Sequence, residues 1–402
     1  MSNELNIFCS SIFIGDEYDG LKKKCKGNLS LADHNLNLNL IKGLDENNFD
    51  LVLVNSTPIP SFPNFSDIFI KKRKFSHKLN ADDVDIGYIN FPFIKKYSKF
   101  RSAYKELKKL VSKAENRTTN VFVYDLHPFF AKAILKLKKK YPFINTCAYL
   151  PDMPDAMLNV VYGDNPSIKA LKFTKEKMRY INSFDSYVFV TELMKEKVDV
   201  NKKPYTVIEG IYNETNFDFD LSAPTENAVL YSGLLREEYG VKRLIDIFKN
   251  SKDKSVKLWL CGGGELTLYA KEAAAQNENI EYFGYLNTKD LRNHQNKAAA
   301  FINPRKNGAE FTRYSFPSKT MEYLASNKPV VGYMLDGYPE DYREFLSIPG
   351  DDSDEALYSE ILKVVNNKNE YIQKGKKARE YILKYKSPKN QCKKIAEMLK
   401  MQ

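Results

Sequence analysis

The residues most able to do chemistry stand in one polar segment, 303–333, which reads NPRKNGAEFTRYSFPSKTMEYLASNKPVVGY. Within it, Pro317 followed by Ser318 predicts a helix start, where the Ser side chain can cap the first turn. Backbone N–H groups at a helix start bind phosphate, and Lys319 adds a positive charge there. Glu322 lies four residues after Ser318, on the same helix face. An anion site one turn from a carboxylate suits a nucleotide diphosphate, because the carboxylate can accept hydrogen bonds from ribose hydroxyls. The alternative interpretation is a surface helix with an ordinary Lys and Glu.

The segments around this one alternate between strand and helix patterns. A short apolar run ends at Asn303, and a buried strand begins at Pro329, so the segment reads as strand, loop, helix and strand. Gly263 is the middle of three glycines between a strand and a helix, where a ligand could approach the backbone, although the spacing is not G-x-G-x-x-G. The same alternation precedes it, with strands predicted at 228–231, 256–260 and 280–283 and helices at 241–249 and 266–275.

The N-terminal half shows the same alternation. Strands are predicted at 5–14, 50–55, 121–124, 144–150 and 186–190, and helices at 31–44, 94–114, 131–141 and 168–182. Asp125, His127, Asp152 and Asp155 stand just past strand ends, where open sheets build their sites. His127 and Asp152 are therefore candidates for catalysis, with a structural or solvated role as the alternative for the histidine.

The length and the two runs of alternation predict two α/β domains. A polar stretch, 212–227, is the expected boundary. The predicted division is an N-terminal Rossmann-like domain over 1–215, a C-terminal Rossmann-like domain over 225–385, and a helix in 386–402 that packs back on the N-terminal domain.

Composition narrows the class of protein. The 402 residues are 43% hydrophobic, which is typical of a globular chain, and no run of about 18 apolar residues predicts a membrane span. The N-terminus lacks the basic start of a secretory signal, so a cytoplasmic location is expected. Five scattered cysteines without C-x-x-C spacing argue against a disulfide framework and a zinc site, and no metal is expected.

Positive charge is concentrated in one region. Residues 71–140 hold 19 Lys and Arg against 6 Asp and Glu, whereas the whole chain carries +11. An anionic membrane leaflet, a nucleic acid or water alone could face such a surface. No nucleic-acid motif accompanies the charge, so no nucleic-acid partner is expected. The predicted helix 94–114 carries an apolar stripe for which core packing is favoured over membrane contact, formed by Ile94, Tyr97, Tyr104, Leu107 and Val111.

Taken together, these motifs resemble the GT-B glycosyltransferases, in particular family 4 with its bacterial surface-polysaccharide members. The resemblance spans both halves and is most specific in 303–333. The matching residues there are Asn303-Pro304-Arg305, Glu310-Phe311-Thr312, Ser315 to Lys319, Glu322-Tyr323 and Lys328-Pro329-Val330, supported by Tyr231-Ser232-Gly233, Tyr239-Gly240, Leu260 to Gly264, Leu335 to Pro339 and, in the N-terminal half, Tyr149 to Met157.

The resemblance implies two Rossmann-like domains facing across a cleft and transfer of a sugar from a nucleotide donor with retention of anomeric configuration and no obligatory metal. Glu322 would hold the donor ribose. The residues implied at the donor diphosphate are Arg305, Ser318 and Lys319, with Arg236 or Lys242 as further basic groups and Gly263 in the glycine loop. Arginine, lysine and helix N–H groups can stabilise a leaving diphosphate without magnesium.

Two positions depart from the family pattern. Many members carry a Glu-x7-Glu pair, but Tyr314 stands eight residues before Glu322, and Glu310 could substitute from the loop. The histidine frequent near the reacting sugar is absent after strand 144–150, where Asp152 stands. Asp152, Glu310 and His127 are therefore the candidate catalytic residues.

The function expected from these observations is a cytoplasmic retaining glycosyltransferase, peripheral on the inner face of the plasma membrane, in surface polysaccharide synthesis. Its donor would be a nucleotide sugar, a UDP-sugar in preference to a GDP-sugar, and its acceptor a glycan or lipid-linked sugar. The alternatives are a catalytically silent GT-B partner subunit, suggested by the two departures, and a GT-B nucleotide-sugar epimerase. No other cofactor is expected.

Overall fold

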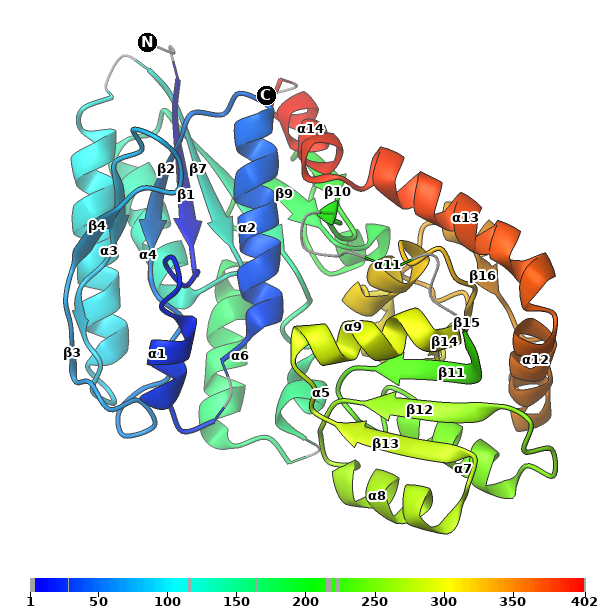
Figure 1. Cartoon of the computed structure of the whole chain (residues 1–402). Helices are drawn as coiled ribbons and strands as arrows, with labels where there is room; N and C mark the ends of the chain where they lie inside the picture. The colour runs from blue at the N-terminus through cyan, green and yellow to red at the C-terminus, as the bar shows by residue number, and fades with distance from the viewer. Residues whose placement is uncertain are drawn as a thin grey trace. The chain divides into compact units, whose positions relative to one another are not determined.

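The computed structural model of the chain describes residues 4–27, 29–114, 117–163, 165–214, 219–220 and 225–400. The chain divides into two compact units. The N-terminal unit comprises 1–211 and 388–402, and the C-terminal unit comprises 212–387. Each unit has a sheet of mostly parallel strands with helices between them (Figure 1). The alternation of strands and helices predicted from the sequence is therefore confirmed in both units.

The N-terminal unit contains a sheet in the order β10-β9-β8-β7-β1-β2-β5-β4, in which only the β4–β5 pairing is antiparallel. Two further strands, β3 and β6, pair antiparallel beside it. The strands are β1 (Glu4–Ser10), β2 (Leu51–Asn55), β3 (Phe69–Ile70), β4 (Arg73–Phe75), β5 (Asp83–Asp85), β6 (Tyr88–Ile89), β7 (Thr118–Tyr124), β8 (Ile144–Leu150), β9 (Ser186–Phe189) and β10 (Tyr205–Val207).

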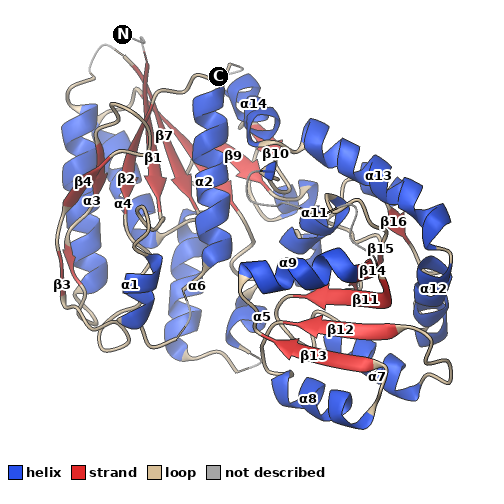
Figure 2. Ribbon diagram, in the orientation of Figure 1, coloured by secondary structure: helices blue, strands red, loops and turns tan. Residues whose placement is uncertain are grey.

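Helices connect most of these strands, except from β2 to β6, and Figure 2 shows them on the faces of the sheet. Helix α14 packs against α2, where Asn47 Nδ2 donates to the Lys389 carbonyl at 2.8 Å. The last helix of the chain therefore completes the N-terminal unit. The helices are α1 (Tyr18–Lys23), α2 (Leu31–Glu46), α3 (Lys95–Val111), α4 (Pro128–Lys140), α5 (Leu158–Tyr162), α6 (Ile168–Tyr180), η1 (Glu192–Glu196) and α14 (Pro388–Leu399).

The C-terminal unit contains a parallel sheet in the order β13-β12-β11-β14-β15-β16. Its strands are β11 (Glu226–Ser232), β12 (Lys257–Cys261), β13 (Ile280–Gly284), β14 (Ala298–Asn303), β15 (Val330–Gly332) and β16 (Leu346–Ser347). Its helices are α7 (Val241–Asn250), α8 (Thr267–Gln276), α9 (Thr288–Lys297), α10 (Glu310–Arg313), α11 (Ser318–Leu324), η3 (Glu340–Glu344), α12 (Asp354–Asn366) and α13 (Lys368–Tyr385).

The strand order of the C-terminal sheet fixes where a site can form. Strand β11 lies between β12 and β14, so the order reverses there and the loops after β11 and β14 leave the same edge. A Cβ built on Gly240 would lie 2.5 Å from the Pro304 carbonyl oxygen, so the two loops approach each other closely. Such a switch point is where doubly wound sheets bind ligands.

Local sequence explains several features of these elements. The Ser30 hydroxyl accepts from the Asp33 amide at 3.4 Å and caps α2. Strand β14, with the sequence AAAFIN, is buried on both faces, as expected for a central parallel strand. Helix α7 turns Leu244, Ile245 and Phe248 into the core and leaves its polar residues outward.

The apolar stripe predicted for helix α3 is only partly correct. Its last members, Leu107 and Val111, are buried, but Ile94 and Tyr97 are exposed by 46% and 58%. The buried positions fall on a row of every fourth residue, on which one lysine, Lys99, is buried with Leu107 and Val111. The start of the helix therefore exposes apolar side chains and buries a positive charge.

No helix within the described residues is long and apolar enough to cross a membrane.

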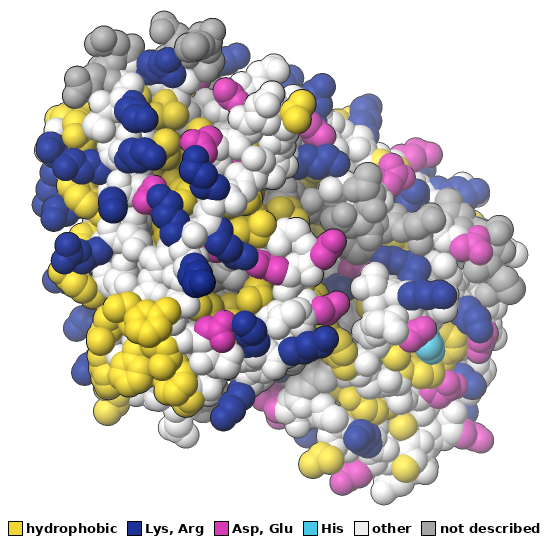
Figure 3. Space-filling model, turned by 60° about the vertical axis from the view of Figure 1, so that its left-hand side comes forward, with side chains coloured by type: hydrophobic (Ala, Val, Ile, Leu, Met, Phe, Trp, Pro, Cys, Tyr) yellow, Lys and Arg dark blue, Asp and Glu magenta, His cyan; other side chains and the backbone are white. Residues whose placement is uncertain are grey.

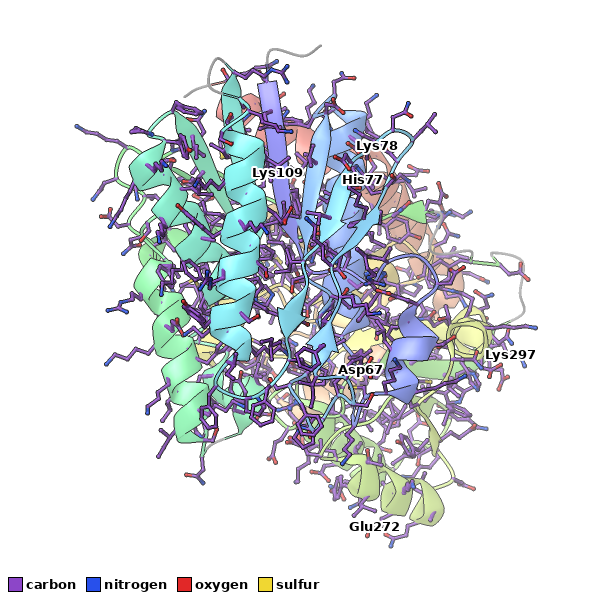
Figure 4. All side chains as sticks on the ribbon, turned by 90° about the vertical axis from the view of Figure 1, so that its left-hand side faces the viewer. Asp67, His77, Lys78, Lys109, Glu272 and Lys297 are labelled. Carbon is purple, nitrogen blue, oxygen red and sulfur yellow. The ribbon has the colours of Figure 1, made fainter. Side chains whose placement is uncertain are left out.

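His77, which is labelled in Figure 4, is held between two carboxylates of the N-terminal unit. His77 Nδ1 lies 2.6 Å from Asp83 Oδ2, and His77 Nε2 lies 3.0 Å from Asp45 Oδ2. Burial opposes the charge on the imidazole, but the hydrogen bonds and negative charges of Asp45 and Asp83 outweigh it and raise the pKa of His77 to about 9. Because the folded pKa lies above the unfolded value, protonated His77 stabilises the fold below about pH 6.5.

We expect the stabilisation by protonated His77 to be lost as the pH rises through the pKa of His77 in the folded protein. The free energy of unfolding, measured by urea titration between pH 6 and 10, should fall by on the order of 2 kcal/mol from this group. The variant His77→Asn cannot take up the proton, so its stability should vary less over the same range. An equal slope in the variant and the parent would contradict this assignment.

Candidate functional site

The second turn of helix α11 carries the carboxylate that the sequence singled out. Glu322 is 6% exposed. Its Oε2 accepts from Lys319 Nζ at 2.7 Å, and its Oε1 accepts from Gln295 Nε2 at 2.9 Å. Arg292 NH2 lies 3.7 Å from the same Oε1. Burial alone would raise the pKa of Glu322, but the charge and hydrogen bond of Lys319, with Gln295 and Arg292, hold it below its usual value. The site therefore keeps an ionised carboxylate away from water.

Tyr323, the next residue, fixes helix α11 to the sheet. Its hydroxyl accepts from the Ser232 amide at 2.8 Å and donates to the Ser232 carbonyl at 3.0 Å. Its ring stacks on Phe301 of β14 with centroids 4.6 Å apart. The last turn of α11 is thereby tied to the carboxyl end of β11, at the reversal of strand order.

Arg305 follows β14 and lies on the same edge. Its guanidinium stacks over Tyr239 at 4.2 Å and over Phe311 at 5.2 Å from the ring centroids. The residue is 9% exposed, and within the described residues it forms no ion pair and its buried Nε has no hydrogen-bond partner. A buried guanidinium without a carboxylate favours an incoming anion such as a phosphate.

The helix start differs from the prediction in one respect. Pro317 takes the cap position and Ser318 is the first helical residue, so the Ser318 side chain does not cap the helix. Ser318 is exposed, and Thr320 is buried with its Oγ1 2.7 Å from the Tyr338 hydroxyl. Thr320 therefore serves packing, whereas Ser318 remains accessible at the helix start.

The sequence suggested Gly263 as the glycine where the backbone is closely approached. In the structure, Gly262 and Gly264 make the close contacts instead. A Cβ on Gly262 would lie 1.9 Å from the Gly233 carbonyl oxygen, and one on Gly264 would lie 2.5 Å from that of Leu235. Gly263 has only Thr267 Oγ1 nearby, at 3.8 Å. Gly262 and Gly264 thus permit the backbone contact, and Gly263 leaves the space beside it open.

The remaining donor-site candidates lie around the same loops. Lys242 is on the first turn of α7, where its Nζ pairs with Asp246 at 3.1 Å. Arg236 lies in the loop between β11 and α7 and is half-buried. Glu310 is exposed at the first residue of α10, and Tyr314 is buried just after that helix. The position of the missing family carboxylate is therefore filled by a packed ring.

The catalytic candidates of the N-terminal unit follow β7 and β8. His127 immediately precedes α4, and its pKa is lowered to about 4 by burial, with the negative charge of Asp125 opposing the shift. Asp125 pairs with Lys177 Nζ at 2.5 Å. Asp152 is half-buried in the loop after β8. The structure thus brings Asp125, His127 and Lys177 together as one group.

Sequence reasoning missed Gln295 and Arg292, which hold Glu322 from helix α9, and Tyr239, which stacks on Arg305. These residues lie far along the chain from their partners, and no local spacing points to them. Within the described residues, no group of three or more His, Cys, Asp or Glu side chains is placed to hold a metal ion.

Replacement by alanine should destabilise the protein more at Gly262 than at Gly263, in the loop after β12. Gly262→Ala places a Cβ against the Gly233 carbonyl at a φ of +132°, so it should lower the free energy of unfolding by roughly 2–3 kcal/mol. Gly263→Ala, its neighbour in the same loop, should change it by less than about 1 kcal/mol. Urea titration of both variants checks the difference, and similar losses in the two would contradict it.

Comparison with known proteins agrees with this architecture. Residues 213–382 match the family model described as Glycosyl transferases group 1. No curated protein sequence matches the chain.

Solved structures match both units. A sucrose-phosphate synthase from Thermosynechococcus elongatus has a TM-score of 0.66 at 12% identity, covering 99% of this chain and 98% of that one. WaaG, a glycosyltransferase involved in lipopolysaccharide biosynthesis, has a TM-score of 0.58 at 12% identity, covering 98% and 99%. An α-glucosyltransferase in complex with UDP and a 13-mer DNA has a TM-score of 0.55 at 13% identity, covering 99% of both chains. The chain has the GT-B fold of glycosyltransferases, and the match of 213–382 to the glycosyl transferases group 1 family supports sugar transfer.

Proposed function

We propose that the protein is a retaining glycosyltransferase that moves a sugar from a nucleotide-sugar donor to a lipid-linked glycan in surface polysaccharide synthesis. The observation that carries the proposal is the buried, ionised Glu322 on the same sheet edge as the unpaired guanidinium of Arg305, in the region that matches the glycosyl transferases group 1 family. A carboxylate can accept from ribose hydroxyls, and a guanidinium can hold the diphosphate.

The chemical step needs a stabilised leaving group. The bond between the anomeric carbon and the diphosphate oxygen breaks, and a bond to the acceptor hydroxyl oxygen forms on the same face, with the hydroxyl proton passing to the leaving phosphate. Arg305, Lys319 and the N–H groups at Ser318 would stabilise the negative charge on the diphosphate. Removing one charge-assisted contact from such a site typically slows the reaction by about 10²–10³.

Nucleotide binding tests the proposed donor site. UDP is the first nucleotide to test, because the α-glucosyltransferase neighbour is in complex with it. We expect UDP at about 100 times its dissociation constant to stabilise the protein by about 2.7 kcal/mol, seen as a raised melting temperature. Glu322→Gln should weaken UDP binding by about tenfold or more, because hydrogen bonds to a charged group are stronger.

The matched control is Glu272→Gln, an exposed carboxylate on helix α8 of the same unit (Figure 4). It should bind UDP like the parent protein. If neither UDP nor GDP nor their sugars stabilise the parent protein, the donor-site assignment is wrong.

A silent partner subunit is the second candidate function, because Tyr314 fills the position of the first family carboxylate. A turnover assay with nucleotide sugar and membrane extract distinguishes the two. Donor consumption that depends on the acceptor supports the transferase, whereas binding without turnover supports the silent subunit. Epimerised nucleotide sugar formed without acceptor would instead indicate an epimerase.

The surface of the N-terminal unit supports a membrane-bound acceptor. In Figure 3, hydrophobic side chains gather in one patch with Lys and Arg side chains around it. We call this patch the aromatic patch. Phe69 of β3 pairs with Ile89 of β6, and Phe91 next to β6 stacks on Phe62 with ring centroids 5.9 Å apart. The patch comprises Phe62, Phe69, Ile89, Phe91, Phe93 and Ile94, of which Phe93 is 100% exposed. Aromatic side chains among lysines are typical of a surface that contacts an anionic bilayer.

We expect the aromatic patch to bind vesicles that contain anionic lipid more strongly than neutral vesicles, measured by co-sedimentation at low salt. Phe93→Ser with Ile94→Ser should reduce the bound fraction several-fold, because buried apolar area contributes about 25 cal/mol per Å². Leu268→Ser, which removes a side chain exposed by 71% from the C-terminal unit, is the control and should bind like the parent. Equal binding by all three proteins would contradict the proposed membrane contact.

A further inference from the structure

A buried lysine in the N-terminal unit lacks a partner of opposite charge. Lys99 of helix α3 is 8% exposed. Its Nζ lies 4.5 Å from the centroid of the Tyr88 ring and 5.0 Å from that of Phe129. Among the residues that the structure describes, no carboxylate or hydrogen-bond acceptor contacts this ammonium group. Burial, followed by the charge of Lys95, lowers the pKa of Lys99 well below its usual value.

A second lysine stands one helical turn before it. Lys95 Nζ donates to the Ile59 carbonyl at 2.7 Å and lies 5.8 Å from the centroid of the same Tyr88 ring. Burial, with the charge of Lys169 from the start of helix α6, lowers the pKa of Lys95 to about 8. Both Nζ atoms therefore lie near the Tyr88 ring, although like charges one turn apart on a helix repel each other.

The nearby carboxylates are already engaged. Asp85 is the acidic group that opposes the pKa shift of Lys99, yet it accepts from Arg73 NH2 at 2.7 Å and from the Thr57 hydroxyl at 3.0 Å. Asp125 pairs with Lys177. Neither carboxylate balances the charge of Lys99.

The start of helix α4 faces the same lysine. Phe129, whose ring contacts Lys99, belongs to the first turn of this helix, which follows the carboxyl end of β7 and begins without a capping side chain. Helix α4 spans 13 residues, so its N–H groups and dipole favour an anion at this end. His127 precedes the helix, and its lowered pKa keeps it neutral near pH 7, so it can donate or accept a hydrogen bond.

We infer that Lys99 and Lys95, together with the start of helix α4, bind the diphosphate of an acceptor of the class of lipid diphosphate-linked glycans. This inference rests on the proposed function, because it names the acceptor class of the same transferase. An anion between the two ammonium groups removes their mutual repulsion and supplies the missing counter-charge. The Tyr88 and Phe129 rings form apolar walls beside it.

A purely structural role for Lys99 makes a different prediction. If the two rings hold the ammonium only as part of the packing, its replacement by Met should lower stability and leave anion binding unchanged. If the Lys99 amine is kept for a ligand, Lys99→Met replaces an unpaired buried polar group with an apolar chain of similar length. The melting temperature should then stay the same or rise, while anion binding is lost.

Calorimetric titration of the full chain with inorganic pyrophosphate tests the site. Arg305→Met is introduced first, so that the candidate donor site binds pyrophosphate weakly. This protein should still bind pyrophosphate. Adding Lys99→Met should weaken the binding by about tenfold or more, because a charge-assisted contact is lost. Adding Lys109→Met instead, an exposed lysine on the same helix (Figure 4), changes the net charge equally and should alter binding by less than about twofold. Equal affinities in the two double variants would overturn the inference, as would no binding to Arg305→Met.

Geranyl diphosphate, used as a second probe, separates a lipid acceptor from a free anion. Binding of this probe that depends on Lys99 supports the acceptor assignment. Pyrophosphate binding that depends on Lys99, without any binding of geranyl diphosphate, overturns that assignment in favour of a free anion. Because neither probe is a nucleotide sugar, these results stand apart from UDP stabilisation, whose absence would instead count against the donor site.

Discussion

The candidate donor site depends on keeping the buried carboxylate of Glu322 ionised. A carboxylate taken out of water tends to hold its proton, and only nearby positive charge and hydrogen bonds reverse this tendency. Here Lys319 supplies the first charge from the same helix, while Gln295 and Arg292 reach the carboxylate from α9. Helices α9 and α11 must therefore be fixed relative to each other. The hydrogen bonds between Tyr323 and the backbone of Ser232 contribute to this, because they join α11 to the central strand β11.

The same physical rule divides the buried charges of the N-terminal unit into two kinds. Asp85 is fully buried and satisfied, because Asn55, Thr57 and Arg73 all donate to it. Lys99 is also buried, but its Nζ has only the faces of two aromatic rings beside it. A satisfied buried charge explains how the fold is held, whereas an unsatisfied one has an energetic cost that a ligand can offset. Whether a buried charged group has hydrogen-bond partners therefore distinguishes a structural role from a binding role better than whether the group is positive or negative.

The sequence predicts the fold class and part of the candidate site. Features that depend on neighbouring residues can be predicted, whereas contacts between distant segments cannot. Alternating strands and helices follow from local periodicity, and the cap at Ser30 follows from one side chain. The four-residue spacing of Ser318 and Glu322 places both on α11, because that relation is local. The partners of Glu322 come from α9, and no local pattern encodes them. Gly263 was singled out as the centre of its triplet, but Gly262 and Gly264 make the close approach, since only the neighbouring strand decides which glycine faces it.

The basic region of the N-terminal unit shows why a charge count is a poor guide to a binding surface. Many of its cations are paired, including Arg73 with Asp85, Lys74 with Asp82, and Lys78 with Asp45. These pairs attract little at long range, because each cation lies beside an anion. Lys99 belongs to this basic region by sequence, yet the row of every fourth residue on α3 turns it inward. A cation on a buried row lies where water cannot screen it, so one such lysine has more influence on a bound anion than several exposed ones.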